Sequence, residues 1–180
     1  MTIETLIAAI PPPAEPAGVF LGPWEPVEAE IGTALPRDYK DLVRVYGSGY
    51  YMEFFGIDVP RCPNLNIRLE HQVRLVSETF LYGDDVSYPL WPAPGGLLSF
   101  GGTDNGDSLF WLTRGAPADW GVVVWDRADL DFELFDCDLT SFLAGLATGE
   151  ILPKAFPEDL LPSDCLFKPT PARALAWPPG

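Results

Sequence analysis

The sequence is poor in basic residues and nearly without histidine. Its 180 residues contain 11 Lys and Arg against 26 Asp and Glu, which gives a formal net charge of −15, and they contain one histidine. The chain has no Lys/Arg cluster that could replace the counterions of a nucleic acid, and its acidic field would repel phosphates. We therefore exclude nucleic acid as a partner and expect cationic partners instead.

Cysteines and long apolar runs are also scarce. The three cysteines, Cys62, Cys137 and Cys165, are scattered and lack CxxC spacing, so we expect a reducing compartment rather than a disulfide framework. No apolar run approaches the roughly 18 residues that cross a bilayer. The first residues, MTIETLIAAIPPP, lack a basic region and contain Glu4, which argues against a signal peptide. We expect a cytoplasmic protein with no membrane association.

Catalytic signals are weak. The single histidine, His71, lies in the charged helical stretch HQVR. A Cys/His pair would require Cys62 or Cys137 to meet it in space, and nothing in the spacing suggests that. Carboxylates are too abundant for one pair to stand out. We expect no enzymatic activity, no cofactor and no metal site; a hydrolase that uses His71 is the enzymatic alternative.

Periodicity predicts an α+β chain, in which helices flank a contiguous run of short strands. We expect an N-terminal arm with a short helix and irregular Pro-rich chain (1–34), a core domain (35–150) and a Pro-rich tail (151–180). Within the helix that begins at Pro36, four apolar residues form one stripe and Gly47 supplies the C-cap. The other helices are predicted at 3–10, 63–82 and 138–148, and the strands at 50–59, 97–100, 108–113, 121–126 and 131–136.

The stretch SFGGTDNGDSLFWLTRG, residues 99–115, is compatible at first sight with three kinds of site. A phosphate cradle requires its glycines to lead into a helix, but here they lead into a second apolar strand. A calcium loop that starts at Asp104 would have Gly106 at position three and Gly115 at position twelve, where oxygen ligands belong. Asn105-Gly106 between apolar runs favours a hairpin with a type I′ turn, in which both residues have positive φ.

An ordered set of segments resembles the SUKH superfamily, which is related to the yeast cell-wall assembly regulators. The segments are LPRDYKDLVRVYGSG, LLSFGGTDNGDSLFWL, GVVVWDRADLDFE and LTSFLAGLATG, within roughly residues 30–147. The chain departs from the superfamily pattern in two places. Ser48 separates two glycines that are usually adjacent. In the closing helix Ser, Phe and Leu are consecutive, whereas the superfamily typically has Ser-Phe-x-x-Phe-Leu-like spacing. The matching positions are Leu35, Pro36, Asp38, Tyr39, Tyr46, Gly47, Phe100, Gly101, Asn105, Gly106, Asp107, Val123, Ser141, Phe142 and Leu143.

This resemblance implies an α+β fold with a single mixed or antiparallel sheet of about five to six strands flanked by helices, and a non-enzymatic binding function. In bacteria, SUKH-like proteins commonly act as immunity proteins that bind a cognate polymorphic toxin, often a nuclease. The acidic charge suits a basic toxin. The alternative is a housekeeping regulatory or scaffold protein of the same fold that binds a cellular partner.

The segment Trp125–Asp138 is the strongest candidate for a contact surface. It holds six carboxylates and one basic residue, Arg127, and its alternative role is a solvated edge that keeps the chain soluble. We expect Trp120, in the turn just before it, to be an exposed aromatic anchor. The predicted partner-binding residues, on or near one face, are Asp104, Asp107, Trp120, Asp129, Asp131 and Glu133.

Overall fold

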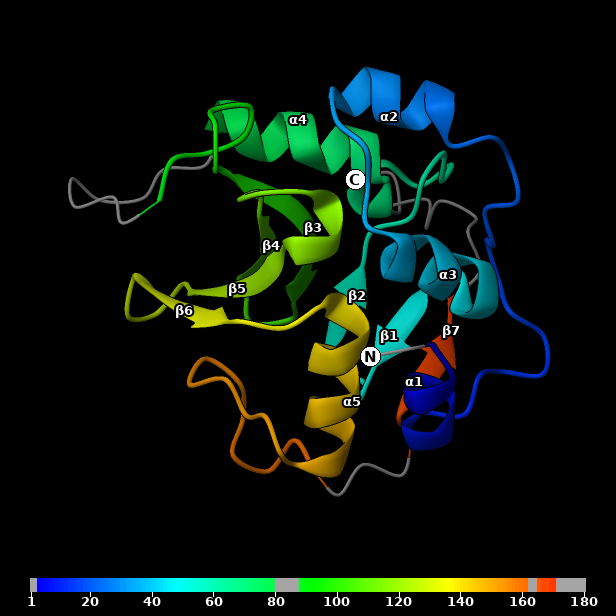
Figure 1. The fold of residues 1–180 in the computed structure, drawn as a ribbon. Helices are drawn as coiled ribbons and strands as arrows, with labels where there is room; N and C mark the ends of the chain where they lie inside the picture. Colours follow the sequence, from blue (N-terminus) through cyan, green and yellow to red (C-terminus); the bar gives the residue numbers. More distant parts are fainter. Residues whose placement is uncertain (1–2, 80–87, 162–164, 171–180) are drawn as a thin grey trace, which may run out of the picture.

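The computed structural model of the chain describes residues 3–79, 88–161 and 165–170. They form a seven-stranded sheet in the order β6-β5-β4-β3-β2-β1-β7, and all neighbouring strands are antiparallel (Figure 1). The α+β class with one helix-flanked sheet is therefore confirmed, with seven strands instead of five to six. The strands are β1 (Gly49–Tyr51), β2 (Phe55–Ile57), β3 (Leu97–Thr103), β4 (Ser108–Leu112), β5 (Gly121–Asp126), β6 (Asp131–Phe135) and β7 (Phe167–Pro169). The helices are α1 (Ile3–Ala9), α2 (Glu25–Ile31), α3 (Arg37–Tyr46), α4 (Leu69–Thr79) and α5 (Leu139–Thr148), with 3-10 turns η1 (Leu65–Ile67) and η2 (Pro117–Asp119).

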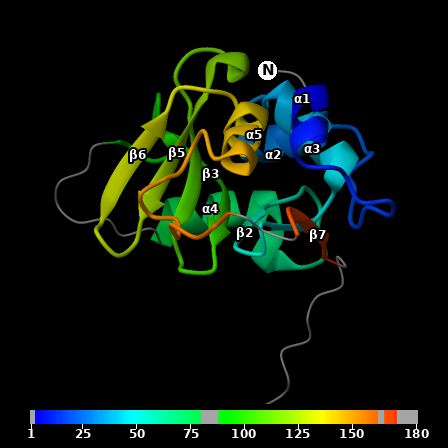
Figure 2. The same ribbon diagram turned by 90° about the horizontal axis from the view of Figure 1, so that it is seen from below.

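Helices cover both faces of the sheet. Helices α1, α3 and α5 lie on one face, and α4 packs on β3 from the other (Figures 1 and 2). The larger apolar core lies under α1, α3 and α5, where Trp111 and Phe142 are fully buried. A smaller cluster lies on the other face, where Phe110 and Val123 meet Val76 of α4. Strands β4 and β5 are thus apolar on consecutive positions because both of their faces are covered.

Helix α3 follows the predicted stripe and ties distant segments together. Tyr39 and Tyr46, two members of the stripe, are fully buried. The Tyr39 hydroxyl donates a hydrogen bond of 2.7 Å to the carbonyl of Asp58, and the Tyr46 hydroxyl donates to the carbonyl of Ile10. Gly47 ends the helix at φ +65°, and a Cβ there would lie 2.0 Å from the carbonyl oxygen of Ala17, so glycine is required.

Several element boundaries differ from the sequence prediction. The stretch 11–34 is not irregular throughout, because α2 lies within it and buries Val27 and Ile31. The expected strand at 50–59 is a hairpin of two short strands, β1 and β2. The helix expected at 63–82 begins with η1 and continues as α4 from Leu69, and its last three positions lie outside the described residues. Strand β7, which pairs with β1, has no counterpart among the predicted strands.

The predicted β3–β4 hairpin is confirmed, but its turn has a different geometry. Gly106 has a φ of +87°, whereas Asn105 is not among the residues with positive φ. The amide of Gly106 donates to the carbonyl of Thr103 at 3.0 Å, and the amide of Thr103 donates to the carbonyl of Asp107 at 3.1 Å. This pattern fits a three-residue loop, in which a left-handed glycine follows a regular turn, rather than type I′.

Candidate functional site

The β3–β4 turn and the β5–β6 turn lie next to each other at one end of the sheet. Asp107 connects them: its carboxylate accepts hydrogen bonds from the Thr103 hydroxyl at 2.7 Å and from the Arg127 amide at 3.1 Å. A Cβ placed on Gly106 would lie 2.9 Å from the Arg127 guanidinium, which confirms how closely the turns pack. We call this region, residues 103–108 and 126–131, the acidic end.

The predicted contact residues differ widely in exposure. Asp104, Asp129 and Asp131 are exposed at the acidic end, and Glu133 is half-buried. The Glu133 carboxylate accepts a hydrogen bond of 2.8 Å from the amide of Lys154. Asp107 is only 4% exposed and its carboxylate joins the two turns, so it has a structural role and little surface to offer a partner.

The expectation that Trp120 is exposed is wrong. Its side chain is only 4% exposed and packs against Trp111 with 6.2 Å between ring centroids. The indole donates a hydrogen bond of 3.4 Å to the carbonyl of Gly115. Trp120 precedes β5, whereas the acidic end follows it, and six residues of strand span roughly 20 Å. The structure therefore brings Asp104, Asp107, Asp129 and Asp131 to one end of the sheet and leaves Trp120 at the other.

Other carboxylates of the acidic segment serve the backbone. The Asp126 carboxylate accepts hydrogen bonds from the amides of Ala128 at 2.7 Å and Asp129 at 3.2 Å, which fixes the β5–β6 turn. The Asp138 carboxylate caps α5 by accepting from the amide of Ser141 at 2.7 Å. Asp side chains commonly accept backbone hydrogen bonds in turns and at helix N-caps. Local structure therefore accounts for part of the negative charge in this segment.

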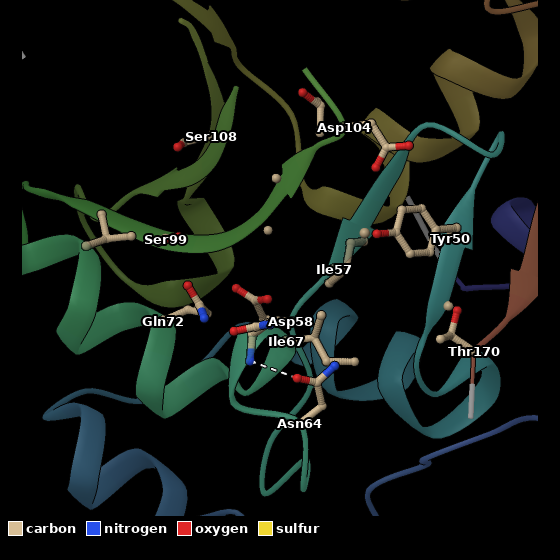
Figure 3. Close-up of a pocket in the computed structure, with 17 residues that line it drawn as sticks. Tyr50, Ile57, Asp58, Asn64, Ile67, Gln72, Ser99, Asp104, Ser108 and Thr170 are labelled. Atoms are coloured by element: carbon tan, nitrogen blue, oxygen red, sulfur yellow. Dashed lines mark hydrogen bonds between the residues drawn. The ribbon is translucent and has the colours of Figure 1, made fainter. Parts of the chain in front are cut away.

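A polar cleft is the second feature of the surface and was not predicted. It has a volume of about 390 Å³ and lies on the side of the sheet that α4 covers, between β1, β2 and β3 and the η1–α4 segment (Figure 3). Two facing glycines leave its floor open, because Gly56 of β2 pairs with Gly102 of β3 and neither has a side chain. The polar side chains that line it are Tyr50, Asp58, Asn64, Asn66, Gln72, Ser99, Thr103, Asp104, Ser108 and Thr170.

Asp58 dominates the electrostatics of this cleft. The residue is only 6% exposed, and its carboxylate points into the cavity near Gln72 (Figure 3). Burial raises the pKa of Asp58 to about 7, and no ion pair or side-chain hydrogen bond within the described residues opposes this rise. The described lining contains no Lys, Arg or His, and its second acid is Asp104 at the border with the acidic end. We call this feature the Asp58 cleft.

The sequence contained only indirect signals for this cleft. Glycines inside strands often mark a close approach or a gap, and both FFGIDV and LLSFGGT carry them. Their significance depends on strand register, because only pairing places Gly56 opposite Gly102. The second signal is Asp58, an acidic residue between the apolar residues Ile57 and Val59.

The remaining candidates for chemistry are His71 and possible metal-binding groups. His71, on α4, has its Nδ1 atom 3.4 Å from the guanidinium of Arg74. Among the described residues, no three His, Cys, Asp or Glu side chains are grouped so that they could hold a metal ion. None of the helices in the described ranges has the length and apolar character that a membrane span requires.

Comparison with known proteins identifies the class. The SUKH_6 family model, described as SMI1-KNR4 cell-wall, matches residues 23–143, about two thirds of the chain. The matched region runs from just before α2 to the middle of α5, and so includes β1 to β6, the acidic end and every residue of the cleft lining except Thr170. No curated protein and no solved structure matches the chain. The chain belongs to the SUKH superfamily.

Proposed function

We propose that this chain is a non-enzymatic binding protein, an immunity protein that neutralises a cognate polymorphic toxin by direct contact. Membership of the SUKH superfamily carries the proposal. The toxin is basic, and a nuclease is the favoured class, because a surface of carboxylates can occupy the cationic cleft in which such an enzyme holds phosphates. The protein acts in the cytoplasm, where a toxin of this class would reach its substrate.

The charge of the chain supports a basic partner. Its net charge of −15 steers cationic proteins toward it over distances near the Debye length, about 8 Å at physiological salt. Within the acidic end, Asp104, Asp129 and Asp131 are the exposed carboxylates. We place the first contacts with the toxin on these three residues, with Glu133 and Asp107 behind them. Steering by charge speeds encounter, while tight binding also requires a well-packed, water-free contact.

The family description favours one alternative. Because the matching model is described as cell-wall, a housekeeping regulator or scaffold that binds a cellular partner is the second candidate. Gene neighbourhood separates the two: an immunity gene is expected beside a toxin gene with a variable C-terminal domain.

Co-expression tests the proposed function directly. The neighbouring toxin is induced in cells with this chain, with an empty plasmid, or with a variant in which Asp104, Asp129 and Asp131 are replaced by lysine. We expect survival only with the unaltered chain, and a complex with the toxin in size-exclusion chromatography. Equal killing in the presence and absence of the unaltered chain contradicts neutralisation. Loss of a hydrolytic activity in His71→Ala would instead support the enzymatic alternative.

A further inference from the structure

The Asp58 cleft combines features that together indicate a ligand. It is a polar cavity of about 390 Å³, within the size range of small-ligand sites. At its base lies a carboxylate that is only 6% exposed and makes no hydrogen bond or ion pair with the described residues. Buried carboxylates in folded proteins are normally paired, because an isolated charge loses its hydration without compensation. Asp58 therefore presents a largely buried acceptor that opens into the cavity and that no donor among the described residues satisfies.

The lining selects a cation with several hydrogen-bond donors. The Tyr50 hydroxyl faces the cavity, and Gln72 and Ser99 line it (Figure 3). Because the Gln72 amide nitrogen already donates to the carbonyl of Leu65 at 2.8 Å, its oxygen is the atom available as an acceptor. A metal ion is disfavoured, since the described residues hold no group of three His, Cys, Asp or Glu side chains that could bind one. The cleft instead offers one buried carboxylate, Asp58, with neutral acceptors around it and Asp104 at its edge.

We infer that the Asp58 cleft is a binding site for a guanidinium group, with the Asp58 carboxylate as its counter-ion. A guanidinium is planar, presents five N–H donors and can bridge both oxygens of a carboxylate. It is also less strongly hydrated than an ammonium, so its transfer into a half-enclosed cavity costs less. The group can belong to an arginine of a protein partner or to a free guanidinium compound, and both share this chemistry. The inference goes beyond toxin neutralisation, and either can fail while the other holds.

The direct test is calorimetric titration of the full chain at pH 8 with N-acetyl-arginine amide. N-acetyl-citrulline amide is the matched probe, because it has nearly the same shape and no charge. We expect the arginine probe to bind roughly tenfold or more tightly than the citrulline probe. Asp58→Asn removes this preference, whereas Asp129→Asn, the same change on an exposed carboxylate, retains it. Equal binding of both probes, or unchanged binding in Asp58→Asn, overturns the inference.

A second variant tests the cleft without changing Asp58, so its result does not depend on whether Asp58→Asn disturbs the fold. A Cβ on Gly56 would meet its nearest neighbour, the carbonyl oxygen of Gly49, at 3.8 Å, which is ordinary contact. Gly56→Leu therefore places a side chain in the cavity while Asp58 remains. We expect Gly56→Leu to abolish binding of the arginine probe and Gly56→Ala to weaken it only slightly. Full binding in Gly56→Leu overturns the assignment to this cleft.

The pH dependence provides a further criterion. Because the pKa of Asp58 is about 7, binding of the arginine probe should weaken by roughly 30-fold from pH 8 to pH 5.5 as the carboxyl gains its proton. The ionisable side chains near Asp58 are Tyr39 of α3, Cys62 before η1, Glu70 of α4, and Tyr50 and Asp104 along the cleft. The variant Asp58→Asn keeps all of these groups and lacks only the Asp58 carboxyl. Because we assign the pH dependence to that carboxyl, the residual binding of the variant should not depend on pH in this range. An equal pH dependence in Asp58→Asn contradicts the role of Asp58.

Two probes, one peptide and free arginine, identify the source of the guanidinium. If the cleft receives an arginine of a protein partner, Ac-Gly-Gly-Arg-Gly-Gly-amide binds at least as tightly as free arginine. If it receives a free compound, the flanking peptide blocks entry and only free arginine binds. Either result supports a guanidinium site, and failure of both probes overturns it.

Discussion

The carboxylate of Asp107 accepts a hydrogen bond of 3.1 Å from the backbone amide of Arg127, and so joins two turns that lie twenty residues apart in the sequence. The second carboxylate oxygen accepts from the Thr103 hydroxyl at 2.7 Å. Because these bonds are partly buried and involve an acceptor with a formal charge, they contribute more to stability than a surface contact of the same length.

Replacement of Asp107 should therefore destabilise the fold. We expect Asp107→Ala to lower the free energy of unfolding by about 2 kcal/mol, because it removes both bonds and leaves the Arg127 amide without its acceptor. Asp104→Ala, an exposed carboxylate in the same turn, is the control and should change stability by less than about 0.5 kcal/mol. Urea denaturation measures both, and equal stability of the two variants would contradict the connecting role of Asp107.

Because Trp120 is buried, its replacement should also destabilise the fold. Its indole packs on Trp111, so Trp120→Ala should lower the free energy of unfolding by about 3 kcal/mol or more through lost apolar contact and a cavity. A variant of an exposed anchor would instead lose partner affinity at unchanged stability. Thermal unfolding of Trp120→Ala beside Leu130→Ala, which alters an exposed side chain, distinguishes the two roles.

Helices and turns whose conformation depends on residues close together in the sequence could be predicted from the sequence. The stripe of α3 and the Asn105-Gly106 turn depend on residues within a few positions of each other, and both are present in the structure. Helix α2 was not predicted, since its seven residues are stabilised by contacts from elsewhere, such as the ion pair of Glu28 with Lys40 of α3. Strand β7 has only three residues and exists through its pairing with β1.

The site was less predictable than the fold because burial and register are tertiary properties. The turn composition around Trp120 indicated a loop correctly, but the packing partner that buries the indole comes from β4. Similarly, the Asp58 cleft arises because Gly56 and Gly102, 46 positions apart in the sequence, are paired across two strands. The acidic end was predictable in part, since the two turns flank neighbouring strands of one antiparallel run.

Charge reversal at the acidic end should slow association with a basic toxin. We expect the double variant Asp129→Lys/Asp131→Lys to lower the association rate constant roughly tenfold at low salt, and to reduce its dependence on salt, because both residues are exposed. The control is Glu15→Lys/Glu25→Lys, which makes the same change in net charge on exposed residues before α2 and at its first position. Helix α2 lies away from β5 and β6 (Figure 1). Surface plasmon resonance at several salt concentrations measures the rates. Equal slowing in both variants would assign the effect to net charge alone.

The raised pKa of Asp58 predicts how stability depends on pH. Burial raises the pKa to about 7 in the folded chain, whereas an unfolded chain releases this proton near pH 4. Between these values the folded state binds more protons than the unfolded state, so this group lowers the free energy of unfolding as pH rises from about 4 to 7. Above pH 7 both states are ionised and its contribution is constant.

Asp58→Asn isolates this contribution, because every other ionisable group is common to the two proteins. The free energy of unfolding of the variant minus that of the unaltered chain should increase from pH 4 to pH 8 by about 4 kcal/mol, because a tenfold difference in proton affinity between the folded and unfolded states corresponds to about 1.4 kcal/mol. Urea titrations at pH 4, 5, 6, 7 and 8 measure this difference, and Asp129→Asn should give a difference that stays nearly flat. A flat profile for Asp58→Asn would mean that the carboxylate is as well solvated in the folded chain as in the unfolded one, and would remove the reason for a counter-ion in the cleft.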